Sequence, residues 1–189
     1  MVRSISIVAL LALSATAAAQ QDGFSYSYIG ASYSRTDYDN YNANGDGFGV
    51  GVSIEIADQF HLFGAYQGAD LDGSINADGW TAGVGFHTPI SDAMDVVAEA
   101  AYVTTKLSLP GGPSVDDNGF AVGAGVRVAA SDAIELDLDL NYVDTDSGNN
   151  TSVGAGFLFN ISDAFALGVS GDWDNDVTVW SLNGRLYFE

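Results

Sequence analysis

The chain has 189 residues, with 25 Asp and Glu against 5 Lys and Arg, and its formal net charge is −20 at pH 7. A charge of this sign and size repels phosphate backbones, so nucleic acid is excluded as an expected partner. The acidity does not indicate disorder, because 47% of the residues are hydrophobic and 12% are aromatic. The absence of cysteine excludes disulfide scaffolds and thiol chemistry.

The first residues have the pattern of a cleaved signal peptide. Arg3 gives a positive start, an apolar run covers residues 5–13, and Ala17-Ala18-Ala19 is a small-residue cleavage site. A retained anchor helix is the alternative interpretation. No later apolar stretch approaches the roughly 20 residues that a spanning helix needs. We therefore expect residues 1–19 to be removed and residues 20–189 to form a single domain.

Beyond residue 23 the hydrophobic pattern has a period of two, which is typical of β-strands. In the clearest segment, residues 134–142, Ile, Leu and Tyr occupy one face while Glu, Asp and Asn occupy the other. The same alternation, weaker in some places, recurs in residues 26–35, 48–56, 60–69, 80–88, 94–105, 120–128, 151–161, 165–173 and 180–188. The sequence thus predicts an all-β chain of about ten strands, with eight as the alternative.

Two kinds of connection alternate along the chain. The short kind covers residues 57–59, 91–93, 131–133 and 162–164, and three of these four read Ser-Asp-Ala, whose side chains can hydrogen-bond their own backbone. The long kind is rich in Asp, Asn and Gly and covers residues 36–47, 70–79, 107–118, 144–150 and 174–176. Short periplasmic turns and long outer loops are typical of bacterial outer-membrane barrels. The pattern predicts a transmembrane up-and-down antiparallel β-barrel with both termini in the periplasm.

Strand alternation alone also fits a soluble secreted β-sandwich, because both folds bury one face of each strand. The second face distinguishes them, since it carries pairs of glycines where a sandwich would expose charged residues to water. These pairs are Gly49/Gly51, Gly83/Gly85, Gly123/Gly125 and Gly154/Gly156. Aromatic residues also gather toward both ends of the predicted strands, as in the two girdles of a membrane barrel. Both features favour the membrane barrel over the sandwich.

The mature chain resembles the small outer-membrane barrels of the OmpA and OmpX/Ail type. The residues that carry the resemblance are the opening Tyr28-Ile29-Gly30-Ala31-Ser32-Tyr33, the Ser-Asp-Ala turns and the closing segment 182–188. The resemblance implies a porin-like protein of a Gram-negative outer membrane. It also implies that the terminal aromatic, Phe188, is the signal read by the barrel assembly machinery. Two departures are Glu189, which follows that aromatic, and a strand count of ten instead of eight.

The predicted inward face carries most of the ionisable residues of the strands. They are Glu55, His61, His87, Asp95, Glu99, Arg127, Glu135, Asp137, Asp139 and Arg185. Buried charges are costly unless they are paired or hydrated, so we expect a polar network in the lumen, with Glu55 and His61 forming a structural pair. The network either fills and stiffens the barrel or forms a selective constriction. About ten strands leave a narrow interior, which favours the filling role.

Neither catalysis nor a metal or cofactor site is predicted. His61 and His87 lie close to short turns, and neither has a nucleophile at a recognisable spacing. Residues 40–45 imitate the start of a calcium loop, but the twelfth position is Gly51 instead of a bidentate Glu.

We therefore expect a monomeric outer-membrane protein with a structural or surface-interaction role, acidic extracellular loops and a largely plugged lumen. A narrow, cation-preferring passive channel is the alternative. The expected partners are outer-membrane lipid and lipopolysaccharide, the assembly machinery, and divalent cations at the acidic loops.

Overall fold

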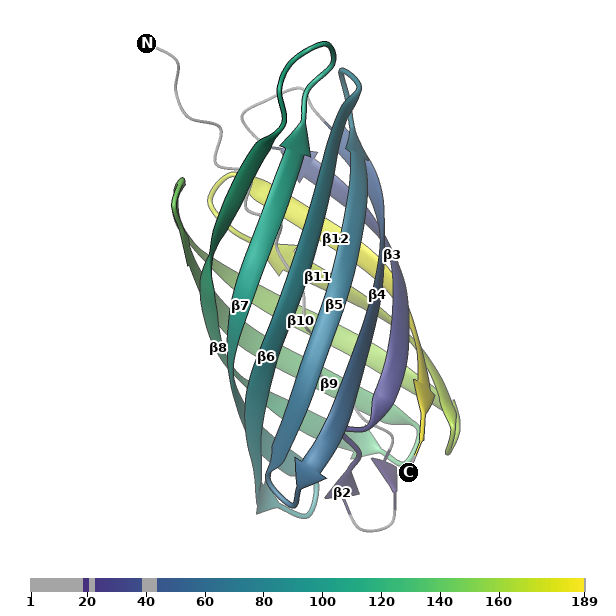
Figure 1. Ribbon diagram of the computed structural model, residues 1–189. Helices are drawn as coiled ribbons and strands as arrows, with labels where there is room; N and C mark the ends of the chain where they lie inside the picture. Colours follow the sequence, from purple (N-terminus) through teal and green to yellow (C-terminus); the bar gives the residue numbers. More distant parts are fainter. Residues whose placement is uncertain (1–18, 21–22, 39–43, 189) are drawn as a thin grey trace.

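The computed structural model describes residues 19–20, 23–38 and 44–188, and ten antiparallel strands close into one barrel (Figure 1). The strands are β3 (Tyr28–Tyr38), β4 (Asn44–Ala57), β5 (Phe60–Leu71), β6 (Ile75–Ser91), β7 (Met94–Ser108), β8 (Val115–Ser131), β9 (Ile134–Thr145), β10 (Gly148–Ser162), β11 (Phe165–Trp173) and β12 (Val177–Tyr187). The predicted up-and-down barrel of ten strands is confirmed, and the alternatives of eight strands and of a soluble sandwich are wrong.

The two short strands that precede β3 stand apart from the barrel wall. β1 (Ala19–Gln20) and β2 (Gly23–Phe24) pair only with each other, and β2 lies at the end of the barrel where the C-terminus is found (Figure 1). The predicted signal peptide falls on residues 1–18, outside the described residues, and on Ala19. In the described part of the chain, no helix is long and apolar enough to cross a membrane.

Each strand pairs with its neighbours in sequence, and the ring closes between β12 and β3. The closing register runs from Tyr187, opposite Tyr28, to Val177, opposite Tyr38. Antiparallel neighbours need only tight connections, so this topology follows directly from the short turns.

The four predicted short turns are confirmed as two-residue connections between the strands. In two of them the serine acts as expected: Ser91 Oγ accepts a hydrogen bond from the Ala93 amide at 3.3 Å, and Ser131 Oγ accepts one from the Ala133 amide at 3.3 Å. The ladder register also shifts by a bulge just before every one of these turns. Bulges at a barrel rim increase the local twist and help the wall to curve.

The strands extend farther toward the loop end than the sequence indicates. β6 and β8 have 17 residues each, and tall hairpins rise at that end in Figure 1. Much of residues 70–79, 107–118 and 144–150, which we expected to be loop, is therefore strand. Pairing continues into water because it satisfies backbone groups as well there as in the membrane.

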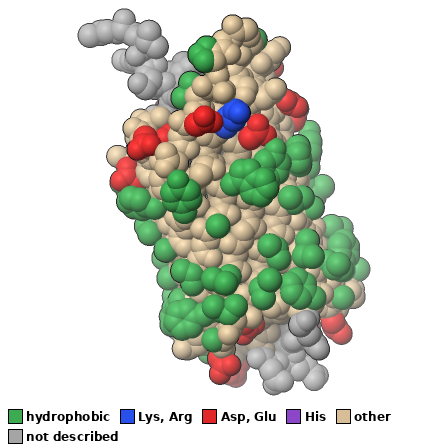
Figure 2. Space-filling model, viewed as in Figure 1, with side chains coloured by type: hydrophobic (Ala, Val, Ile, Leu, Met, Phe, Trp, Pro, Cys, Tyr) green, Lys and Arg blue, Asp and Glu red, His purple; other side chains and the backbone are tan. Residues whose placement is uncertain are grey.

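The outer surface of the barrel is apolar. In β9, Leu136, Leu138 and Leu140 are 41%, 54% and 54% exposed, while Glu135 on the inward face of the same strand is fully buried. Figure 2 shows hydrophobic side chains covering the wall and acidic side chains gathered above and below them. An apolar surface of this extent suits lipid and not water.

The inward glycines leave space for large side chains of neighbouring strands. A Cβ atom at Gly85 would overlap the ring of His61, and Cβ atoms at Gly154 and Gly156 would overlap the carboxylates of Asp139 and Asp137. A glycine on one strand thus makes room inside the barrel for a large side chain on the next strand. Glycine also eases the curvature of the wall.

Candidate functional site in the barrel lumen

All ten residues that we predicted for the lumen lie at inward positions of their strands. Glu55 is exposed near the periplasmic end of β4, and the other nine are buried or partly buried. The structure distributes them over β4 to β9 and β12.

The first group is an ion pair between β8 and β9. Arg127 Nε and Nη2 both donate to Glu135 Oε1, at 2.9 and 2.7 Å. The two residues are 2% and 0% exposed. A charge-assisted pair of this kind, removed from water, rigidly joins its two strands.

The second group contains His61, and it corrects the expected pairing of this residue with Glu55. His61 Nε2 lies 3.2 Å from Glu99 Oε1 on β7. Glu55 is directly opposite His61 in the strand register, but the imidazole extends over Gly85 of the neighbouring strand, away from β4. The empty space at this glycine therefore determines the partner of the histidine.

The third group is centred on Tyr26, which was not among the residues predicted for the lumen; it fills the periplasmic end of the lumen and is 0% exposed. Its ring stacks on His87, with centroids 3.5 Å apart, and on His61, with centroids 4.9 Å apart. Its hydroxyl donates to Asp95 Oδ2 at 2.9 Å, and the Arg127 guanidinium carbon lies 4.5 Å from the ring centroid.

The sequence interpretation counted Tyr26 within the first strand, because the alternating residues 26–35 read as one segment. The structure begins that strand at Tyr28. The alternation Phe24-Ser25-Tyr26-Ser27 is typical of a strand. Nothing in the sequence indicates that this segment leaves the wall and enters the lumen.

Three hydrogen bonds join the segment around Tyr26 to the barrel, two through its backbone carbonyls and one through a side chain. Ser53 Oγ donates to the Tyr26 carbonyl at 2.7 Å, the Glu55 amide donates to Ser27 Oγ at 3.1 Å, and the Phe188 amide donates to the Ser27 carbonyl at 3.2 Å. The ring of Phe24 faces the Arg127 guanidinium at 4.6 Å. Phe24 also packs against the buried cluster Tyr28, Leu158, Ala166 and Tyr187.

The fourth group is a set of carboxylates in the middle of the lumen. Asp139 on β9 and Asp172 on β11 both lie opposite Gly154 of β10, and Asp137 is two residues from Asp139. Asp172 is only 2% exposed and was not predicted, because its strand was recognised by its apolar outward face. Asn141 Nδ2 donates to Asp139 Oδ1.

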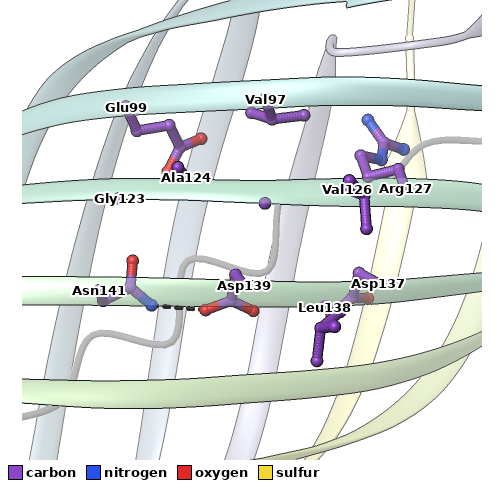
Figure 3. A pocket seen from close by; sticks show the side chains of 11 residues that line it. Val97, Glu99, Gly123, Ala124, Val126, Arg127, Asp137, Leu138, Asp139 and Asn141 are labelled. Atoms are coloured by element: carbon purple, nitrogen blue, oxygen red, sulfur yellow. Dashed lines mark hydrogen bonds between the residues drawn. The ribbon is translucent and has the colours of Figure 1, made fainter. Parts of the chain in front are cut away.

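The open space beside these carboxylates is small. Figure 3 shows Glu99, Asp139 and Asn141 around a cavity in the lumen, and its volume is about 30 Å³. A second cavity of about 70 Å³ is lined by Ser32, Gln67 and Asn183 among others. Each of these two volumes holds a few water molecules at most.

No group of three or more His, Asp or Glu side chains within residues 23–38 and 44–188 is arranged to hold a metal ion. The segment that imitates the start of a calcium loop, residues 40–45, includes residues 40–43, which lie outside the described residues.

Comparison with known proteins identifies the family. The family model described as the outer membrane protein beta-barrel domain matches residues 5–170. The chain belongs to this family. The predicted resemblance to small outer-membrane barrels and the bacterial outer-membrane location are thereby confirmed.

Solved structures share the fold at low sequence identity. The beta domain of the Bordetella autotransporter BrkA is 12% identical, with a TM-score of 0.54, covering 87% of this chain and 100% of that one. The KdgM porin is 11% identical, with a TM-score of 0.50, covering 85% and 99%. Ail, the attachment invasion locus protein of Yersinia pestis, is 17% identical, with a TM-score of 0.43, covering 85% and 95%. No curated protein sequence matches the chain. The likenesses to the BrkA beta domain and to the KdgM porin show the fold alone.

Proposed function

We propose that this protein is a closed outer-membrane anchor that presents its acidic hairpins at the cell surface, without enzymatic activity and without conducting solutes. The observation that carries this proposal is the occupied periplasmic end of the lumen. Tyr26 is fully buried there, the Arg127–Glu135 pair joins β8 to β9 on the inner face beside it, and the two cavities described above have volumes of about 30 and 70 Å³.

The loop end has the properties of a stable surface for interaction. Tyr102 Oη on β7 donates to Asn118 Oδ1 on β8 at 2.8 Å, and Asn118 Nδ2 donates to Asp146 Oδ2 in the β9–β10 turn at 2.9 Å, so side chains link the β7–β8 and β9–β10 hairpins above the membrane. Asn150 Nδ2 of the β9–β10 hairpin donates to Asp174 Oδ2 of the β11–β12 hairpin at 2.6 Å. These bonds restrict the hairpins that carry the acids, and a rigid acidic surface favours cationic partners.

Lipopolysaccharide is the proposed membrane partner, through divalent cations that bridge its phosphates to the acidic hairpins. The proposal rests on charge, because like-charged groups need a counterion between them. In vesicles that contain lipopolysaccharide, Mg²⁺ is expected to raise the unfolding temperature of the barrel. An equal effect in vesicles of neutral lipid would contradict it.

A conductance measurement in planar bilayers tests the closed lumen. The full mature chain is refolded, and its folding is verified by heat-dependent migration on a detergent gel. We expect no reproducible conductance at high protein load. Reproducible conductance of the folded protein would overturn the proposal.

A narrow cation-preferring channel is the second candidate, and the carboxylates Asp137, Asp139 and Asp172 are the observation that favours it. If the folded protein conducts, this candidate predicts selectivity for cations. It also predicts that replacing Asp137 and Asp139 together by Asn reduces that selectivity. Conductance without cation preference would contradict both candidates.

A further inference from the structure

The four residues that surround Tyr26 come from adjacent strands. His61, His87, Asp95 and Arg127 lie on β5, β6, β7 and β8, so one sector of the wall forms a slot that contacts the phenol ring on its face and its hydroxyl group. The slot offers two imidazole rings, a cation and a carboxylate acceptor. This combination matches a phenol, which has an electron-rich face and a single donor group.

The segment that carries Tyr26 is attached to the wall much less firmly than a strand is. The ladders of β3 with β4 and with β12 both begin at Tyr28. Residues 24–27 belong to no barrel ladder. Two hydrogen bonds, from Ser53 and Phe188, hold their backbone carbonyls, and a third, from the Glu55 amide, holds the Ser27 hydroxyl. Release of the segment therefore leaves every strand pair of the barrel intact.

The slot also retains unsatisfied polar atoms while it is filled. Among the described residues, His61 Nδ1, His87 Nε2 and Arg127 Nη1 are buried and have no hydrogen-bond partner. A buried donor or acceptor without a partner costs free energy, and water entering the slot would satisfy these atoms. The cost of releasing Tyr26 is partly offset in this way.

We propose that the slot is an intramolecular binding site for a phenolic side chain, and that residues 24–27 form a detachable plug whose docking through Tyr26 closes the periplasmic mouth of the lumen. The inference rests on the proposed closed lumen and names the device that closes it. With the plug released, water and small cations reach the carboxylates Glu99, Asp137 and Asp139 above the slot.

Planar-bilayer conductance of the full mature chain tests the plug with a variant and a matched control. Tyr26→Ala removes the ring and the hydroxyl from the slot. Ser25→Ala changes the same segment but loses only a local hydrogen bond from the Ser27 amide. We expect the wild type and Ser25→Ala to be silent, and Tyr26→Ala to show cation-selective openings at least tenfold more often.

A peptide added in trans distinguishes loss of the plug from general damage to the barrel. The peptide Gly-Phe-Ser-Tyr-Ser, which reproduces residues 23–27, is expected to reduce the openings of Tyr26→Ala at least tenfold when added on the periplasmic side. The same peptide with Ala in place of Tyr serves as the control and is expected to have no effect. Equal effects of the two peptides would overturn the phenol site.

The remaining outcomes separate the plug from the closed-anchor function. A folded Tyr26→Ala that is as silent as the wild type overturns the plug and leaves the closed anchor standing. A wild type that conducts, with at least tenfold more openings in Tyr26→Ala, supports the plug and overturns the closed anchor. If Tyr26→Ala does not fold, His87→Leu weakens the slot from the wall side, and equal openings in His87→Leu and the wild type then overturn the plug.

Discussion

The imidazole ring of His61 lies over Gly85 of the neighbouring strand, in the space that any side chain at position 85 would need. Gly85→Ala is therefore expected to displace the ring and to disturb its contacts with Tyr26 and Glu99. Overpacking of this kind destabilises a folded protein by about 1–3 kcal/mol. Urea unfolding in lipid vesicles measures the change.

Gly30→Ala is the matched control for this substitution. Gly30 also faces inward, but a Cβ atom there would lie 3.7 Å or more from its neighbours, which is ordinary contact. We expect the unfolding midpoint of Gly30→Ala to stay close to that of the wild type. Equal midpoints for the two variants would show that His61 does not depend on the space at Gly85.

The Arg127–Glu135 pair is expected to be costly to break and less costly to replace. Arg127→Leu leaves Glu135 buried without its guanidinium partner, which destabilises a protein by about 3–5 kcal/mol. The double variant Arg127→Leu/Glu135→Leu is expected to recover most of this loss, because no buried carboxylate is then left behind. Unfolding free energies of the two variants test this, and equal destabilisation would contradict it.

The membrane position of the wall predicts a cost that depends on depth. Leu138 faces outward midway along β9, and Leu138→Arg is expected to destabilise the barrel by about 2–4 kcal/mol. Thr151 faces outward opposite Tyr142, at the level of an aromatic girdle, and Thr151→Arg is expected to cost at most about 1 kcal/mol. The unfolding free energies of both variants are measured in lipid vesicles. Equal losses would contradict the different depths that we assign to Leu138 and Thr151.

The final aromatic residue is predicted to act in assembly. Phe188 faces outward at the periplasmic end and is 38% exposed, and Phe165 is a comparable aromatic at the same end, 37% exposed. We expect Phe188→Ala to lower the amount of folded protein in the outer membrane severalfold, and Phe165→Ala to lower it much less. Equal amounts, measured by heat-dependent migration from isolated membranes, would mean that the position of the aromatic at the chain end is unimportant.

The wall of the barrel was predictable because its signals are local. The outward face of β9 repeats every second residue, and each Ser-Asp-Ala turn is complete within three residues. The inward direction of Arg127 and Glu135 follows from the same alternation, and so does their place on adjacent strands. The structure adds that the two side chains are in contact, with 2.7 Å between Arg127 Nη2 and Glu135 Oε1.

The contents of the lumen were less predictable, because they depend on which residues meet across strands. The pairing of His61 with Glu99 follows from the empty space at Gly85, which no single segment reveals. Asp172 is the single ionisable residue on the inward face of β11, a strand that was recognised by its outward face. Tyr26 precedes the first strand of the wall and lies inside the lumen. Strand length was underestimated because pairing continues above the membrane without apolar residues.

The seam between β12 and β3 has a consequence for the order of events during biogenesis. The first and last strands of the wall are partners, so the ring cannot close until the final residues of the chain have been synthesised and exported. Ser27 accepts a hydrogen bond from the Phe188 amide, which places the residues before the first strand against the end of the last one. Residues 24–27 precede their binding partners on β5 to β8 in the chain. The seam closes last, around a mouth that its own N-terminal residues can already occupy.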